Sequence, residues 1–170
     1  LGFILGLYQS EAVNRWWTVV NEGVYGIGAA LQDNIMYTAA YLTDNNNSEI
    51  VEAKKKLILY CKYALCFTLR RCAGHDRQFQ VLAAEEALDA EERVIIETHH
   101  HQAHNLVCGW IIALWTSLYA RKLLPGAEES LQNAIGACQD GRKATSLVDR
   151  YVNVQIPYEY YHLLILIAKL

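Results

Sequence analysis

Only two prolines, Pro125 and Pro157, occur in the 170 residues, and both lie between apolar segments of helical length rather than inside one. A proline inside a helix removes a hydrogen bond and clashes with the preceding turn, so their positions leave the intervening segments free to be helical. The chain also has just 10 glycines, too few for a fold of many short strands and tight turns. We therefore predict an all-α protein.

Apolar residues recur at helical spacing, as at Ile27, Leu31, Ile35 and Ala39. We expect Ser48 to cap a helix whose first turns carry Glu49 and Glu52, because a hydroxyl accepts from free N–H groups and carboxylates favour the positive helix end. The helices that we expect are Leu1–Asn21, Gly26–Thr43, Ile50–Cys72, Gln78–His99, Ala103–Tyr119 and Ala127–Tyr151, followed by an apolar run over Tyr158–Leu170.

Composition narrows the function classes. The net charge of −3 leaves no basic footprint for nucleic acid. The 4 tryptophans and 11 tyrosines suit a half-wet boundary, either at a membrane surface or between subunits. No apolar run reaches the 18 uncharged residues of a clear membrane span, so buried helices of a soluble bundle explain the runs equally well.

Both ends of the chain are apolar. It opens on Leu1 inside one hydrophobic run and closes on Ile165–Leu170 inside another. We expect residues 1–170 to form a single domain that is part of a longer polypeptide, without the first membrane helix and most of the last. The five cysteines lie at irregular spacings without a C-x-x-C pair, and we interpret them as free thiols buried among helices.

Few residue patterns indicate chemistry. On a helix, His100 and His104 would share one face near Glu97, which leaves a metal site open, but a solvated loop or helix start also explains this histidine cluster. The carboxylates at Glu85, Glu86, Glu91 and Glu92 read as a solvated helix face. No phosphate loop, nucleophile elbow or Cys/His pattern is present, so we predict that the chain is not an enzyme and holds no metal of its own.

Two places join arginine to the end of an apolar segment. Arg15 precedes Trp16 and Trp17, and Arg70 closes the third segment. An arginine in such a place is either paired and structural or in contact with an anion, and indoles beside it suit a membrane boundary or a tight helix junction.

These residues resemble the bestrophins, a family of pentameric anion channels, and the animal-type members in particular. Leu5-Gly6-Leu7-Tyr8 followed by Asn14-Arg15-Trp16-Trp17 is similar to the family's Leu-Gly-Phe-Tyr run leading to Arg-Trp-Trp at the same spacing. Further ungapped similarity is carried by Leu57-Ile58 with Tyr60, by Leu69-Arg70, and by Leu131-Gln132, Arg142 and Ile156-Pro157. The resemblance covers nearly the whole chain.

The resemblance implies a membrane-embedded homopentamer that passes chloride or bicarbonate through one central pore. Phe3 and Leu7 would line its neck, with Leu7 in place of a usual Phe. Glu129 would lie at the cytosolic aperture, where the family usually has a small apolar residue; a ring of carboxylates there would favour cations over anions. Arg15, Trp16, Trp17, Arg70 and Arg142 are candidates for structural or anion contacts. Calcium activation is a family property whose ligands lie outside this chain.

Two alternatives remain. The neck residues are also explained as ordinary core residues of a helix. A helical interaction module that does not conduct would share the same apolar periodicity, and extraction behaviour would separate it from a membrane channel.

Overall fold

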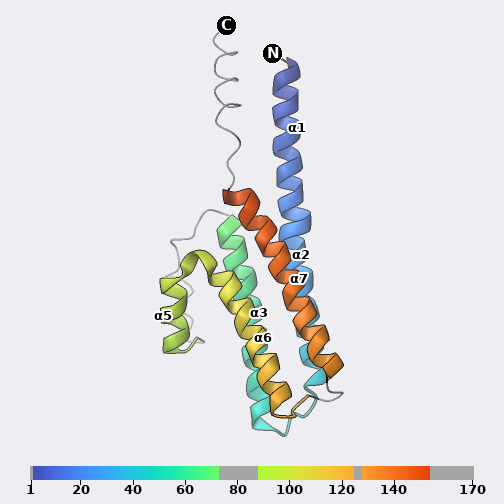
Figure 1. Ribbon diagram of the computed structural model, residues 1–170, viewed down its shortest axis with the longest axis vertical. Helices are drawn as coiled ribbons and strands as arrows, with labels where there is room; N and C mark the ends of the chain where they lie inside the picture. Colours follow the sequence, from blue (N-terminus) through green and yellow to red (C-terminus); the bar gives the residue numbers. More distant parts are fainter. Residues whose placement is uncertain (1, 73–87, 125–127, 154–170) are drawn as a thin grey trace.

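The computed structural model describes residues 2–72, 88–124 and 128–153 (Figure 1). All regular structure within these ranges is helical, which confirms the predicted all-α class. The elements are α1 (Gly2–Thr18), the π-helix η1 (Val19–Val24), α2 (Tyr25–Tyr41), α3 (Ser48–Cys72), α5 (Ala90–Thr98), the 3-10 turn η2 (His100–Gln102), α6 (Ala103–Ala120) and α7 (Glu128–Asn153).

The first three elements form one uninterrupted rod. We expected a break between Asn21 and Gly26, but the backbone stays helical from Gly2 to Tyr41, with η1 as a wider turn inside it. The glycines in this stretch do not end the helix because they serve close packing instead. In Figure 1 the rod runs along the whole molecule, and α1 extends beyond the other helices.

Helices α2, α3, α6 and α7 pack together as a bundle, in which α2 contacts α7 and α3, and α6 contacts α3 and α7. Its core holds large side chains that are fully buried, among them Trp115, Tyr63 and Ile27. The predicted apolar face of α2 is confirmed for two of its four residues and wrong for the other two. Ile27 and Leu31 are buried, but Ile35 and Ala39 are exposed. Two polar residues, Asn34 and Thr38, take the buried positions on that face.

Gly23 allows η1 to lie against α7. A Cβ atom built on Gly23 would come within 2.5 Å of Val148 Cγ2 and 3.6 Å of Leu147 Cδ2. Gly26 repeats the pattern, with Ala144 Cβ at 3.1 Å from its hypothetical Cβ. Since a real Cβ atom does not come within 2.5 Å of another carbon, the absence of a side chain at Gly23 sets the distance between the two helices.

Two helix starts differ from expectation. Asn47, and not Ser48, caps α3, because its side-chain oxygen accepts from the Glu49 N–H at 3.0 Å. Glu49 does lie in the first turn. Within the described part of the segment that we expected to be helical from residue 78, Leu88 and Asp89 are not helical, and Asp89 caps α5 in a reciprocal capping box with Glu92. Residues 78–87 and the apolar run over residues 158–170 lie outside the described residues.

Candidate functional site

The projecting helix α1 carries both residues that the resemblance assigns to a pore neck. Phe3 is 78% exposed and Leu7 is 53% exposed. They lie four residues apart, so they share one helix face. Neither packs into the core of the described residues, which argues against the core alternative. Two large apolar side chains in water are unfavourable, and α1 thus presents a face that suits a covering partner.

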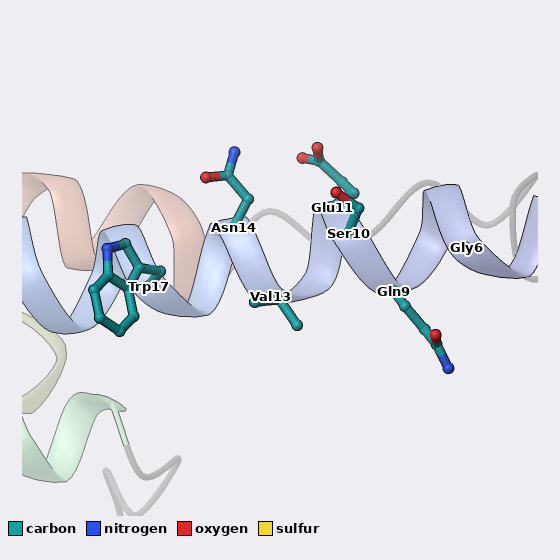
Figure 2. A pocket seen from close by; sticks show the side chains of 7 residues that line it. All are labelled: Gly6, Gln9, Ser10, Glu11, Val13, Asn14 and Trp17. Carbon is teal, nitrogen blue, oxygen red and sulfur yellow. The ribbon is translucent and has the colours of Figure 1, made fainter.

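A shallow depression follows on α1 (Figure 2). Its lining consists of Gly6, Gln9, Ser10, Glu11, Val13, Asn14 and Trp17. All of these belong to α1, so no other described element supplies an opposing wall. Ser10 and Asn14 continue the face of Phe3 and Leu7 at helical spacing, and their hydroxyl and amide groups can donate hydrogen bonds. The face therefore changes from apolar to polar toward the bundle.

Arg15 joins α1 to the end of α7. Its guanidinium donates a hydrogen bond to the Tyr151 carbonyl oxygen at 3.5 Å and lies 5.6 Å from the centre of the Tyr151 ring. A cation over an aromatic face is attracted by the electrons of the ring. This contact ties α1 to the C-terminal end of α7.

Glu129 lies in the first turn of α7 and is exposed. Figure 1 places the start of α7 at the opposite end of the molecule from the start of α1. The two predicted constrictions thus lie at opposite ends of the long axis. No described contact of Glu129 tests its assignment to an aperture, which stays a prediction.

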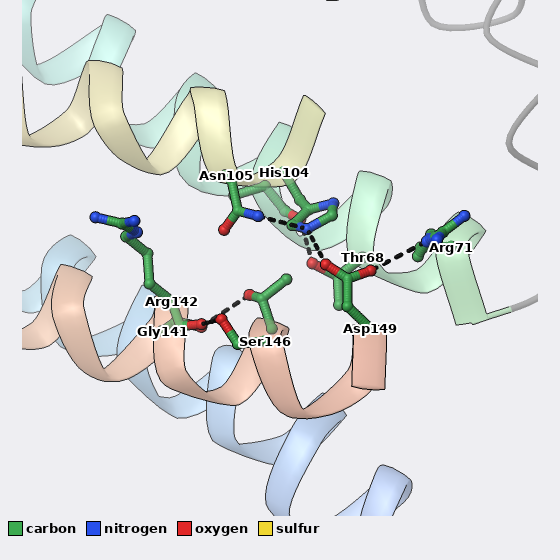
Figure 3. Close-up of polar contacts among 10 residues, drawn as sticks. Thr68, Arg71, His104, Asn105, Gly141, Arg142, Ser146 and Asp149 are labelled. Atoms are coloured by element: carbon green, nitrogen blue, oxygen red, sulfur yellow. Dashed lines mark hydrogen bonds and ion pairs between the residues drawn. The ribbon is translucent and has the colours of Figure 1, made fainter. Parts of the chain in front are cut away.

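A polar cluster in which His104 is buried and its partners are half-buried joins α3, α6 and α7 (Figure 3). Asp149 Oδ1 accepts from Arg71 Nε at 3.0 Å, and Asp149 Oδ2 lies 3.1 Å from His104 Nε2. The His104 Nε2 atom that donates to Asp149 carries the ring proton. The Asn105 atom beside Nε2 must then be a hydrogen-bond acceptor, which in an amide is the oxygen. Rotating the Asn105 amide by 180° would bring its oxygen next to His104 Nε2. That oxygen otherwise has no hydrogen-bond partner among the described residues.

His104 corrects our reading of the histidine cluster. We expected a solvated loop or helix start, with a metal site as an alternative, but His104 is buried and contacts Asp149. His100 belongs to η2 and His104 to α6, so the two do not share one continuous α-helix. In the described ranges no group of three or more His, Cys, Asp or Glu side chains is placed to hold a metal ion.

A second buried polar contact joins α2, α6 and α7. Asn34 Oδ1 accepts from Trp115 Nε1 at 3.3 Å and from Cys138 Sγ at 3.4 Å, while Asn34 Nδ2 donates to the Ala30 carbonyl at 3.0 Å. Because an unpaired amide in this core would be strongly destabilising, these bonds specify one packing of the three helices. Helical spacing assigns Asn34, seven residues after Ile27 and three after Leu31, to the buried face of α2, and a polar residue at such a position is a signal that our prediction missed.

A polar contact holds helix α5 on α3, and it includes Glu92, which we had predicted to lie on a solvated helix face. Tyr60 donates its hydroxyl proton to Glu92 Oε1, and Lys56 Nζ lies 3.8 Å from the same oxygen. Burial, with the Glu92 carboxylate beside it, raises the pKa of Tyr60 well above its usual value. Glu92 is thus half-buried and paired, whereas Glu91 is exposed as expected.

The five cysteines are free thiols, as predicted. Cys61, Cys108 and Cys138 are buried, whereas Cys66 and Cys72 are half-buried. Burial raises the pKa of Cys61 and of Cys138 to about 12, and that of Cys108 to about 11. Three of the five thiols are therefore protonated and poorly reactive at neutral pH.

The remaining candidates, Arg70 and Arg142, lie far apart in the chain. Arg70 is half-buried in the last turn of α3. Arg142 is exposed and lines a depression on α7 together with Lys143 and Arg150. The three cations give this face of α7 a local positive charge. Neither placement decides between a structural and an anion-contact role.

Among the helices in the described ranges, none combines the length and the apolar character that a membrane crossing requires. The fold and the exposed face of α1 define an all-helical bundle from which one helix projects.

The chain belongs to the bestrophin family: the family described as "Bestrophin, RFP-TM, chloride channel" matches residues 1–170. This confirms the resemblance drawn from the motifs. It is a family of membrane chloride channels and not a family of enzymes. No curated protein and no solved structure matches the chain.

Proposed function

We propose that the chain is an ion channel subunit that passes chloride or bicarbonate passively through the central pore of a homopentamer. Family membership supports the channel class. The observation that carries the proposal is the pair Phe3 and Leu7, which are exposed on one face of a helix that projects beyond its own bundle. Copies of α1 around an axis would cover these side chains and form an apolar neck.

The order of side chains along α1 fits an anion path. Apolar rings conduct when they are wide and wetted, and block when they dry. Ser10 and Asn14 follow on the same face, and their donor groups can replace part of the water around an anion. In the proposed channel, this order of side chains would put a gate next to a polar vestibule.

Glu129 would stand at the other end of the same path. It is exposed in the first turn of α7, so copies of it around the axis would form a ring of carboxylates. We propose that this ring tunes selectivity toward cations, because negative charges lower the local concentration of anions.

Cysteine accessibility tests the neck. Phe3→Cys and Leu7→Cys are made in a background in which the half-buried Cys66 and Cys72 are serine, so that mainly the new thiol reacts. The membrane-reconstituted chain is then exposed to a charged methanethiosulfonate during current recording. We expect modification at either position to change the chloride current by about twofold or more, because a charge is added to an apolar constriction.

Gln9→Cys is the matched control. Gln9 is exposed on α1 but lies about 140° around the helix from the midpoint of Phe3 and Leu7, at about 100° per residue. Modification there should leave the current nearly unchanged. Equal effects at all three positions would contradict the assignment of the pore face. A chain that extracts into salt buffer and gives no current would instead support the non-conducting interaction module.

A further inference from the structure

Trp17 is a large side chain of α1 that has little cover among the described residues. It is 59% exposed, and the centre of its indole lies 6.2 Å from that of Trp16. Val13, one turn earlier, is 62% exposed and lies about 40° from Trp17 around the helix. The broad face of an indole attracts a cation, and an apolar neighbour favours the removal of both from water. This flank of α1 therefore suits a partner that carries a cation.

The direction of the flank follows from its position around α1. Arg15 contacts Tyr151 of α7, so it marks the side of α1 that is turned toward α7. The midpoint of Phe3 and Leu7, which define the proposed pore face, lies about 100° around the helix from Arg15. Trp17 lies about 60° further in the same sense. It thus projects to one side of the pore face, away from α7.

Arg150 projects from the other flank of the same chain. The side of α7 that packs on the rod is marked by Gly141, Ala144, Leu147 and Val148. Arg150 lies about 130° around α7 from the centre of that side. Because α7 runs antiparallel to the rod (Figure 1), this angle puts Arg150 about 50° from the direction of the pore face, on the opposite side from Trp17.

The two side chains lie at similar heights along the rod. Val148 packs beside Gly23, and the Tyr151 carbonyl oxygen accepts from Arg15. Arg150 lies between those two residues of α7, so it is level with the stretch from Arg15 to Gly23, which contains Trp17. Arg150 is exposed, and its guanidinium has no hydrogen-bond or ion-pair partner within the described ranges.

We propose that Trp17 of one copy and Arg150 of the next copy form a cation–π contact between neighbouring subunits of the homopentamer. This inference rests on the proposed function, because it needs five copies whose Phe3 and Leu7 face the axis. Rotation about an axis parallel to the rod keeps every residue at its height. In a five-fold ring, the direction to each neighbour makes an angle of about 54° with the direction to the axis. Trp17 and Arg150 lie close to these two directions, so the neighbouring copy supplies the group that each of them lacks.

Cysteine cross-linking of the full chain in detergent tests the contact. Trp17→Cys and Arg150→Cys are combined in a background in which Cys66 and Cys72 are serine, and a short bis-maleimide is added. Both substituted positions are exposed, and the three buried thiols react poorly. Since the two new thiols lie on opposite flanks of one chain, we expect links between chains, seen as a ladder of up to five chains on a denaturing gel.

Trp16→Cys with Arg150→Cys is the matched control. Trp16 is 60% exposed beside Trp17, but it lies about 160° from the pore face and should give at least about threefold less covalent dimer. Chains with Trp17→Cys alone and chains with Arg150→Cys alone should cross-link only when they are mixed. A ladder of equal strength from the control, or cross-linking within either unmixed sample, would overturn the contact.

A second measurement tests the role of the charge. Arg150→Gln should lower the pentamer fraction at a fixed detergent concentration at least about twofold, but it should have little effect when Trp17 is already leucine. An equal effect in both backgrounds would reject the cation–π contact. Light scattering separates the two levels of the argument: a pentameric mass without a ladder rejects this contact alone, whereas a monomeric mass also rejects the proposed homopentamer.

Discussion

The contact of Gly23 with α7 supports a quantitative test. Alanine at this position would place Cβ 2.5 Å from Val148 Cγ2, about 1 Å inside normal carbon contact. Val148 is fully buried and branched at Cβ, so it cannot swing aside. Overpacking of this kind costs about 1–3 kcal/mol. Alanine also gains about 1 kcal/mol of helix propensity over glycine, which offsets part of the loss.

Gly28→Ala isolates the clash. Gly28 lies in α2, and a Cβ there meets nothing within 4 Å, so this variant keeps the propensity gain without the contact. We expect the free energy of unfolding of Gly23→Ala to fall about 1–3 kcal/mol below that of Gly28→Ala. Denaturant unfolding of the purified chain in mild detergent, followed by far-ultraviolet circular dichroism, measures the difference.

A double-mutant cycle with Val148→Ala completes the test. Removing the Val148 methyl groups makes room for the new Cβ, so the combined variant should be more stable than the sum of the two single losses predicts, by about 1 kcal/mol or more. Equal stabilisation by Gly23→Ala and Gly28→Ala would refute the close approach of η1 to α7. So would a cycle without coupling.

Three further predictions concern charge and thiols. Asp149→Asn should lower the free energy of unfolding by about 1–3 kcal/mol, because it weakens the contacts to Arg71 and His104. Asp140→Asn, in an exposed ion pair, should change it by less than about 0.5 kcal/mol. The same unfolding assay measures both variants. Maleimide near pH 8 should label only Cys66 and Cys72 in the folded chain, since at most about one thousandth of each buried thiol is ionised. After denaturation it should label all five cysteines, and mass spectrometry counts the labels. Glu129→Gln should raise the anion-to-cation permeability ratio, as measured from reversal potentials in a salt gradient, and an unchanged ratio would remove Glu129 from the aperture.

Sequence reasoning predicted the helices because apolar periodicity and the lack of prolines act locally. It failed where tertiary contacts decide. Gly23 and Gly26 read as a helix break, since glycine disfavours helix, but the packing against Val148 and Ala144 more than offsets that preference. The helix cap is Asn47 and not Ser48. The two adjacent side chains both carry an oxygen that can accept from the helix N–H groups, so the sequence did not distinguish them.

For the candidate site too, the sequence predicted what depends on local spacing and missed what depends on tertiary contacts. Phe3 and Leu7 share a face by spacing alone, so the sequence placed them correctly on one side of α1. His104 contacts Asp149, 45 positions away in the chain, and Asn34 contacts Trp115, 81 positions away. No local pattern encodes such pairs, although a polar residue at a position that periodicity assigns to the core is a signal that could have indicated Asn34.

The uninterrupted rod from Gly2 to Tyr41 acts as a lever. Its lower part packs against α7 and α3, and Arg15 on α1 contacts Tyr151 of α7. The arm beyond that contact, from Arg15 to Phe3, is about 18 Å long at 1.5 Å per residue. A tilt of about 10° at Arg15 would therefore carry Phe3 sideways by about 3 Å, roughly the width of a water molecule. Small rearrangements among α2 and α7 are thus magnified at the tip of α1.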